Sequence, residues 1–204
     1  TGEPYMINID TCNDALPEPQ QKLGLSIKQS NLCSEITLPT DEERTAVCCL
    51  SSVNLEHFDT WSKEPQFIED LITMLDNVIE HYIENAVDTS QLGGYSANYT
   101  RFSKYVKEGK EGFAKSAYSA YRERSLGLGS MGFHAYLQSR NIPFEGLFAT
   151  SFNHKAFKHI KEKAVKASKR LAELRGECPD LHGHDSRNAN LLAIAPNASS
   201  GIIC

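Results

Sequence analysis

The chain has 204 residues, of which 40% are hydrophobic and 23% are charged, a composition typical of an ordinary soluble globular protein. This length allows one large domain or part of a bigger one. A formal net charge of −5 gives no reason to expect nucleic acid or an anionic membrane as a partner, and the apolar runs are too short to span a bilayer.

Alternating apolar and polar residues predict three strands in the first quarter of the chain. Residues 3–13 are expected to form a strand that runs into a turn, and residues 31–38 alternate in the same way. Residues 45–55 are β-branched and largely apolar, which also indicates a strand. The short, charged run 38–44 is expected to be a turn between the last two strands.

Two long helices follow from apolar residues spaced three or four apart. The first covers 64–87, with Pro65 in its first turn, and the second covers 149–175, with Gly176 as its C-cap. The apolar run 191–195 is expected to be a strand that delivers a turn. Strand pairs separated by helices predict an α/β protein with buried strands, whose strand ends are the natural place for chemistry.

Two stretches between the helices are less regular. Residues 88–120 interleave Gly, Ser, Tyr and Lys, and because the overall charge is acidic they indicate a solvated loop or short helix inside an enzyme rather than a nucleic-acid surface. Residues 124–144 form a glycine-punctuated turn into a helix. They lack the preceding strand and the distant acidic residue of a dinucleotide fingerprint, so the glycines are expected to permit close backbone packing.

An amide, a thiol and a carboxylate recur at every second position near the start of the chain. In an extended segment Asn31, Cys33 and Glu35 would share one face. This grouping is unusual for a structural face, because a buried carboxylate or amide is costly without hydrogen-bond partners. If the face is exposed, the grouping is accidental.

The six cysteines are too sparse for a disulfide scaffold, which favours reduced, metal-binding or catalytic thiols. A thiolate nucleophile at Cys33 would need a nearby His or Lys, and its run supplies none. No partner set stands at zinc-site spacing, so no metal ligand is assigned. A thiyl radical needs neither an activating His or Lys nor further metal ligands. Radical chemistry would also explain Glu35 as a base and Asn31 as an orienting group.

Other polar groups leave two interpretations each. Adjacent Cys48 and Cys49 would point to opposite faces of a strand, as small core residues or as one member of a redox pair whose partner thiol comes from elsewhere. The run 195–201 suits either a phosphate-binding nest or a plain turn. His182 and His184 are expected to be loop residues.

Several runs, in this order, resemble the large catalytic subunit of ribonucleotide reductase. They are "GEPYMINIDTCN", "SNLCSEITLP", "AVCCLSSVNL", "ERSLGLGSMGF", "LAELRGECPD" and "RNANLLAIAPNASSG", and they cover nearly the whole chain. The resemblance is of the class I type, and the stretch 88–120 is reminiscent of bacteriophage versions.

The resemblance implies a role for each matching residue. Cys33 matches the cysteine that becomes a transient thiyl radical and abstracts the ribose 3′-hydrogen. Glu35 matches the carboxylate that takes the 3′-hydroxyl proton, and Asn31 matches the amide that orients the substrate hydroxyls. Cys48 aligns with one member of the redox-active dithiol. The substrate's phosphates would be held by Pro196, Asn197, Ala198, Ser199 and Ser200, where Asn197 departs from the commoner Ser or Thr.

The implied fold is a ten-stranded α/β barrel with the radical cysteine on a finger loop through its centre. Residues 1–204 would supply part of this catalytic barrel domain, as a fragment without the N-terminal regulatory and C-terminal parts, inactive alone. The implied activity is reduction of ribonucleoside diphosphates to deoxyribonucleoside diphosphates, with no cofactor bound in this chain.

The resemblance also implies partners. A small subunit with a di-metal centre would generate the radical, thioredoxin or glutaredoxin would supply electrons, and the rest of the large subunit would complete a homodimer in the cytoplasm, or the host cytoplasm for a phage protein. Three alternatives stay open: an adenosylcobalamin-dependent reductase, a non-catalytic thiol or metal-binding module, and a helical interaction domain using helices 64–87 and 149–175.

Overall fold

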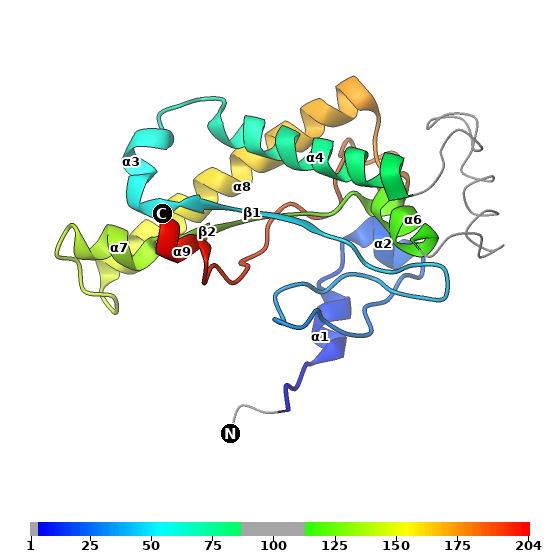
Figure 1. The fold of residues 1–204 in the computed structure, drawn as a ribbon, viewed down its shortest axis with the longest axis horizontal. Helices are drawn as coiled ribbons and strands as arrows, with labels where there is room; N and C mark the ends of the chain where they lie inside the picture. The colour runs from blue at the N-terminus through cyan, green and yellow to red at the C-terminus, as the bar shows by residue number, and fades with distance from the viewer. Residues whose placement is uncertain (1–3, 87–112) are drawn as a thin grey trace.

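A computed structural model describes residues 4–86 and 113–204 of the chain (Figure 1). The strands are β1 (Cys49–Asn54) and β2 (Leu126–Met131). The helices in the order of the chain are α1 (Ile9–Asp14), α2 (Glu18–Lys22), α3 (Phe58–Trp61), α4 (Phe67–Ala86), α6 (Ala114–Glu123), α7 (Phe133–Gln138), α8 (Leu147–Arg175) and α9 (Ser200–Ile203). Two 3₁₀ turns, η1 (Leu55–His57) and η3 (Pro179–Leu181), complete the elements named here.

The two strands are parallel, and a third stretch of chain runs beside them. Cys49 of β1 stands opposite Leu126 of β2. The segment 190–193 runs parallel to β2, because Leu128 forms a bridge with Leu192 and its N–H donates to the Leu191 carbonyl at 2.9 Å. Helix α4 lies in the chain between β1 and β2, and α8 lies between β2 and 190–193. These helical crossovers between parallel segments confirm the α/β class.

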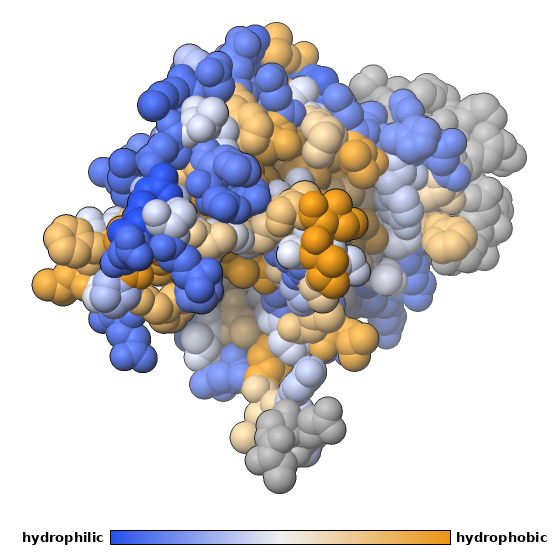
Figure 2. Space-filling view, turned by 60° about the vertical axis from the view of Figure 1, so that its left-hand side comes forward, coloured by the Kyte–Doolittle hydropathy of each residue, from blue (hydrophilic) through white to orange (hydrophobic). Residues whose placement is uncertain are grey.

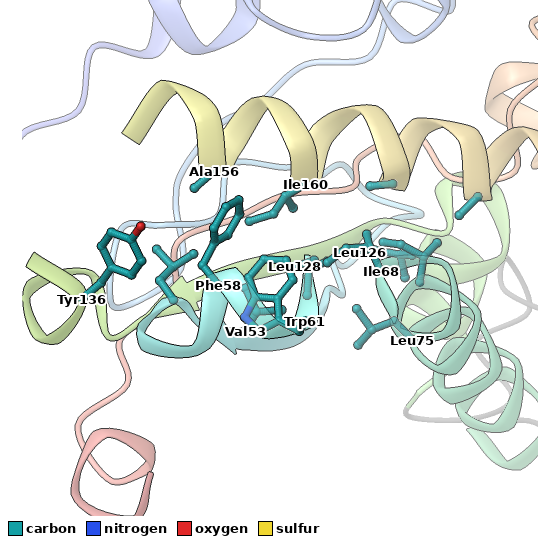
Figure 3. Close-up of a cluster of buried hydrophobic side chains, with 14 of the residues drawn as sticks. Val53, Phe58, Trp61, Ile68, Leu75, Leu126, Leu128, Tyr136, Ala156 and Ile160 are labelled. Carbon is teal, nitrogen blue, oxygen red and sulfur yellow. The ribbon is translucent and has the colours of Figure 1, made fainter. Parts of the chain in front are cut away.

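Helices α4 and α8 cover one face of these segments (Figure 1). Each helix turns an apolar stripe inward because its apolar residues recur every three or four positions. Alanines in α8 allow its backbone to come close to its neighbours, and aromatic side chains from α3 fill the end of the core (Figure 3). The buried stripes comprise Ile68, Ile72, Leu75, Ile79 and Ile83 of α4 and Ala156, Ile160, Ala164, Ala167 and Leu171 of α8.

The opposite face of the strands carries small and exposed side chains. A Cβ atom built on Gly127 would meet the side chains of Leu50, Ala193 and Cys48, so these residues share one face. Leu50 is 41% exposed on this side, whereas Val53 is buried against the helices. Figure 2 shows hydrophobic residues reaching the surface in the middle of the view, between hydrophilic groups. Because Leu50 is exposed, this face is only partly covered within the described residues.

Two of the predicted strands are wrong. Residues 9–14 of the first form helix α1, because the side chain of Asn8 accepts a hydrogen bond from the Thr11 N–H at 3.3 Å and caps the helix. The stretch 31–38 is a turn followed by irregular chain, because Asn31 captures backbone groups that a strand would otherwise use. Alternation of side chains alone did not reveal these local hydrogen bonds.

The third strand and the long helices are confirmed. Strand β1 lies within 45–55, α4 within 64–87, and α8 begins at Leu147 and ends at Arg175. Helix α4 starts two residues after Pro65, which lies in the turn before it. Gly176 caps α8 with a φ of 87°, a left-handed conformation that glycine adopts without strain.

The glycine-rich run contains a strand where a turn was expected. Residues 126–131 form β2, and α7 follows it. Gly129 is needed there, because a Cβ on it would stand 2.2 Å from the carbonyl oxygen of Ala193. The expected close backbone packing is therefore confirmed. Of the stretch 88–120, residues 88–112 lie outside the described residues, and 114–120 belong to α6.

The run 191–195 was expected to be a strand, and it forms only the single bridge at Leu192. It leads into residues 196–199 and then α9 (Figure 1). Among the described helices, none has both the length and the apolar content needed to cross a membrane.

Candidate active site around Asn31 and Cys48

The candidate site begins with a tight turn closed by Asn31. Its backbone N–H donates to the Ile36 carbonyl at 3.2 Å, and its side-chain Oδ1 accepts from the Ile36 N–H at 3.0 Å. The Ser34 N–H donates to the Asn31 carbonyl at 3.1 Å, and Ser34 adopts a φ of 66°. Cys33 therefore lies at the tip of a turn. The expectation that Asn31, Cys33 and Glu35 share one face of a strand is wrong.

The turn leaves Cys33 accessible. The residue is exposed, and its neighbour Leu32 is 87% exposed. Because both side chains are exposed, a bound molecule or another protein segment can contact this tip of the turn. An accessible thiol at a turn can exchange a hydrogen atom with a bound molecule, provided that the molecule reaches the sulfur.

Glu35 combines burial with an unused hydrogen-bond acceptor. Its residue is half-buried, and the Oε2 atom is buried with no hydrogen-bond partner in the described part of the chain. A buried polar atom without a partner costs about 1–3 kcal/mol, so its retention calls for a physical reason. A hydroxyl group of a bound molecule would supply the missing hydrogen bond, and a carboxylate in that position can accept its proton.

A pocket of about 270 Å³ joins the turn to the start of β1. Asn31 and Ser30 line it from the turn, and Cys48 and Leu50 line it from the strand side. Glu35 acts on the same thiol, because its negative charge contributes to raising the pKa of Cys48. The structure therefore brings Asn31 and Cys48 into one pocket, while Cys33 and Glu35 do not line it and Glu35 acts on Cys48 through its charge.

Cys48 is held as a protonated thiol. Burial, with smaller contributions in the same direction from the neighbouring Cys49, Glu123 and Glu35, raises its pKa to about 12. Gly127 leaves room for the sulfur, since a Cβ there would lie 3.2 Å from Cys48 Sγ. A thiol with this pKa is a poor nucleophile at neutral pH but still a source of hydrogen and electrons.

The two adjacent cysteines divide between two environments. Cys48 lines the pocket, whereas Cys49 packs against the hydrophobic core. Burial also raises the pKa of Cys49, opposed by the positive charge of Arg124. The prediction that they face opposite sides of the strand is confirmed.

The turn 196–200 lies at the other end of the parallel segments. The Asn197 side chain donates to the Ala195 carbonyl at 2.8 Å, and the Gly201 N–H donates to the Asn197 carbonyl at 2.7 Å. Because 190–193 is parallel to β2, this turn follows the carboxyl end of the strands, whereas Cys48 precedes the amino end of β1. None of the residues 196–200 lines the Asn31–Cys48 pocket.

The sequence analysis missed the buried charges behind the site. Asp76 accepts hydrogen bonds from Arg124, Arg175 and Arg187, which outweigh burial and lower its pKa. Burial raises the pKa of Glu123 to about 7. The only available signal was indirect: Asp76 stands at a position of the apolar stripe of α4, between Leu75 and Ile79.

Comparison with known proteins identifies the fold around this pocket. Residues 1–187 match the family described as "Ribonucleotide reductase, barrel domain". The chain belongs to the ribonucleotide reductase barrel-domain family. The resemblance inferred from the motifs is thereby confirmed, together with a barrel domain as the fold of the family.

Individual reductase large subunits match all or most of the chain. The "Ribonucleoside-diphosphate reductase large subunit" of Invertebrate iridescent virus 3 is 46% identical over 203 residues, covering 100% of this chain and 29% of that subunit. The large subunit of Variola virus is 31% identical over 191 residues, covering 94% of this chain and 22% of that subunit.

A solved reductase shares the three-dimensional arrangement. The structure of the "Actinobacillus ureae class Id ribonucleotide reductase alpha subunit" superposes with a TM-score of 0.83 at 36% identity, covering 100% of this chain and 35% of that one. The chain thus spans about a third or less of the length of these reductases.

Proposed function

We propose that this chain is part of the catalytic barrel of a ribonucleoside-diphosphate reductase large subunit, which makes deoxyribonucleotides for DNA synthesis. The observation that carries the proposal is the Asn31–Cys48 pocket, in which an amide and a thiol meet beside a carboxylate with an unpartnered oxygen. The names of the matching proteins, reductase large and alpha subunits, support the same activity.

The chemistry assigned to the residues is radical chemistry. Cys33, as a thiyl radical, takes the 3′-hydrogen of the ribose and becomes a thiol. Glu35 takes the proton of the 3′-hydroxyl, which helps the protonated 2′-hydroxyl to leave as water, and Asn31 orients the hydroxyls. The unpartnered Oε2 of Glu35 and the accessible thiol of Cys33 suit these two roles.

Reduction requires two electrons and two hydrogens. Cys48 and a second thiol from outside the described residues would provide them and close to a disulfide, after which Cys33 returns the 3′-hydrogen to the product. The high pKa of the Cys48 thiol, about 12, fits a group that holds its hydrogen until the substrate radical is present. A dithiol protein of the thioredoxin or glutaredoxin type would reopen the disulfide.

Binding of the diphosphate is proposed for Pro196, Asn197, Ala198, Ser199 and Ser200. This turn follows a parallel segment, where ligands of α/β proteins are commonly bound, and it leads directly into α9. Because the turn and the pocket lie at different ends of the strands, the substrate would extend across the face that carries Cys48 and Leu50.

The remaining partners follow from the same proposal. A separate small subunit would generate the radical that reaches Cys33, and the rest of the large subunit would complete the barrel, supply the second redox thiol and form a homodimer. The finger loop of this family is proposed to be the Asn31–Ile36 turn. The enzyme would act in the cytoplasm, where dithiol reductants are present.

The test is nucleotide reduction by a complete large subunit that carries these residues, assayed with its small subunit and a dithiol. Replacement of Cys33 by Ser should abolish deoxyribonucleotide formation, because a serine hydroxyl does not form the radical under these conditions. Cys49→Ser, which alters the neighbour of Cys48 on the core side, should retain turnover. Retained activity in the Cys33→Ser variant would overturn the proposal.

A further inference from the structure

Asp180 is a buried carboxylate that binds two arginines from distant parts of the chain. Its Oδ2 accepts from Arg44 Nη1 at 2.6 Å and its Oδ1 accepts from Arg44 Nη2 at 3.0 Å, and Oδ1 also accepts from Arg122 Nε at 2.6 Å. The side chains of Arg44 and Asp180 are 5% and 0% exposed, and that of Arg122 is 11% exposed. We call these three residues the Asp180 triad.

The Asp180 triad connects three elements. Arg44 lies in the segment that joins the Asn31 turn to β1, Arg122 lies in α6, and Asp180 lies in the 3₁₀ turn η3 after α8. A guanidinium that binds a carboxylate through two parallel hydrogen bonds is held in both distance and orientation, which a single hydrogen bond or a lysine does not achieve. Arg44 is therefore anchored as a rigid point.

Arg44 lies in the chain between residues that line the candidate active-site pocket. Thr40, Thr45, Ala46 and Cys48, on both sides of it in the chain, line the pocket with Asn31. Arg44 is not among the lining residues, because its side chain extends to Asp180 behind the wall. The pocket wall is thus held from behind by the Arg44–Asp180 pair, whereas Arg122 ties Asp180 to α6 and not to the wall.

The backbone of this segment is irregular. No helix or strand is assigned between residues 31 and 48. Its backbone is tied by long hydrogen bonds, from the Thr40 N–H to the Ser26 carbonyl at 3.3 Å and from the Thr45 N–H to the Lys115 carbonyl at 3.3 Å. The bidentate pair of Arg44 and Asp180, with a closest nitrogen–oxygen distance of 2.6 Å, ties this segment to η3. Loss of this pair would free the wall between Asn31 and Cys48.

We propose that Asp180, acting through Arg44, is a positioning residue that sets the place of Cys48 relative to Asn31 and Glu35 during nucleotide reduction. This inference rests on the proposed function. Misplacement of reacting groups by about 1 Å costs on the order of 10²-fold in rate, so a movable wall should lower turnover more than substrate binding. Asp180 and Arg44 touch no substrate in this assignment.

The experiment compares two arginine variants that each remove one partner of the same carboxylate. In a complete large subunit with its small subunit and a dithiol, Arg44→Met should lower kcat by about tenfold or more while KM changes less than about twofold. Arg122→Met, which leaves the Arg44–Asp180 pair in place, should keep kcat within about twofold of the unmodified subunit.

A second measurement reads the position of Cys48 directly. Alkylation of Cys48 by iodoacetamide, followed by mass spectrometry, should be at least about fivefold faster in Arg44→Met than in Arg122→Met, because the loosened wall exposes the thiol. Arg44→Lys keeps the positive charge but cannot form two parallel hydrogen bonds to Asp180. Its kcat should therefore lie between those of Arg44→Met and the unmodified subunit. If Arg44→Met fails to fold, Arg44→Lys is the variant that tests the positioning role. A kcat of Arg44→Lys within twofold of that of the unmodified subunit would then contradict the role.

Failure of this inference is distinguishable from failure of the proposed function. If the unmodified subunit reduces no nucleotide, the proposed function fails, and the alkylation rates of Cys48 still decide whether the Arg44–Asp180 pair positions the thiol. If the unmodified subunit is active, equal loss of kcat in Arg44→Met and Arg122→Met shows a general effect on stability and overturns the positioning role. Unchanged kcat in Arg44→Met overturns it as well.

Discussion

Gly129 and Ala193 lie in backbone contact between strand β2 and the segment that runs parallel to it. A Cβ atom on Gly129 would stand 2.2 Å from the Ala193 carbonyl oxygen, far inside van der Waals contact. The same region carries the hydrogen bonds from Leu126 to Asn190 and from Leu128 to Leu191. A side chain at this position would therefore separate the third parallel segment from β2, and with it the turn 196–200.

Gly129→Ala should destabilise the protein. Overpacking against backbone cannot be relieved by a rotamer change, and such insertions cost about 1–3 kcal/mol or more. The thermal unfolding midpoint of a complete subunit should fall by several degrees. Gly201→Ala is the matched control, because nothing lies within 4 Å of a Cβ there and its φ is not positive. Equal midpoints for the two variants would contradict the packing described here.

Glu123 should make stability fall as pH rises. Burial raises the pKa of this carboxyl from 4.5 to about 7 in the folded protein, so between these values the folded state holds a proton that the unfolded state has released. The stability contribution is therefore present below pH 4.5 and lost as pH rises to about 7. Glu123→Gln should flatten this part of the profile.

The measurement is the free energy of urea unfolding at pH 5 to 8, compared between the unmodified protein and Glu123→Gln. Gln keeps the shape of the side chain and one acceptor oxygen, whereas Glu123 accepts from Gln20 on Oε2 and from Ser119 on Oε1. The difference between the two proteins should grow with pH to about 1–3 kcal/mol, since one pKa unit corresponds to about 1.4 kcal/mol. Parallel profiles would show that Glu123 titrates normally.

Cys48 should react slowly with thiol reagents. Its pKa of about 12, against an ordinary value of 9.0, leaves on the order of 10³-fold less thiolate than an exposed cysteine at pH 8. Iodoacetamide should therefore label the exposed Cys33 and Cys204 well before Cys48. Mass spectrometry of peptides over time checks the order, and labelling of Cys48 at the rate of Cys204 would contradict the burial and pKa shift.

Glu35→Gln should lower kcat for nucleotide reduction while changing KM little. The substitution keeps a hydrogen-bonding group but removes the proton acceptor, and loss of a positioned general base typically costs about 10²- to 10⁴-fold. Steady-state kinetics of a complete large subunit with its small subunit measure both constants.

Glu42→Gln provides the matched control for Glu35→Gln. Glu42 is exposed on the segment between the Asn31 turn and β1 and does not line the pocket, so its loss should leave kcat within about twofold. Equal effects of the two substitutions would argue against a proton-transfer role for Glu35.

The residues proposed to carry the chemistry were recognisable from sequence because they stand in short motifs. Asn31, Cys33 and Glu35 lie within five positions, and Cys48 lies in a β-branched run that the structure confirms as the approach to β1. Residue type and order were enough to indicate the reductase family. The grouping as one strand face was wrong, because a side-chain hydrogen bond from the Ile36 N–H to Asn31 bends the chain into a turn.

Helix positions and their buried faces were determined by the sequence itself, because apolar periodicity is a local property that α4 and α8 retain in the fold. Only the tertiary structure decided which distant charges meet. Arg44 and Asp180 are 136 positions apart, and Asp76 gathers arginines from 48 to 111 positions away. Burial makes these pairs mandatory, since a charge removed from water needs a partner, but local sequence does not specify which partner the folded chain brings to it.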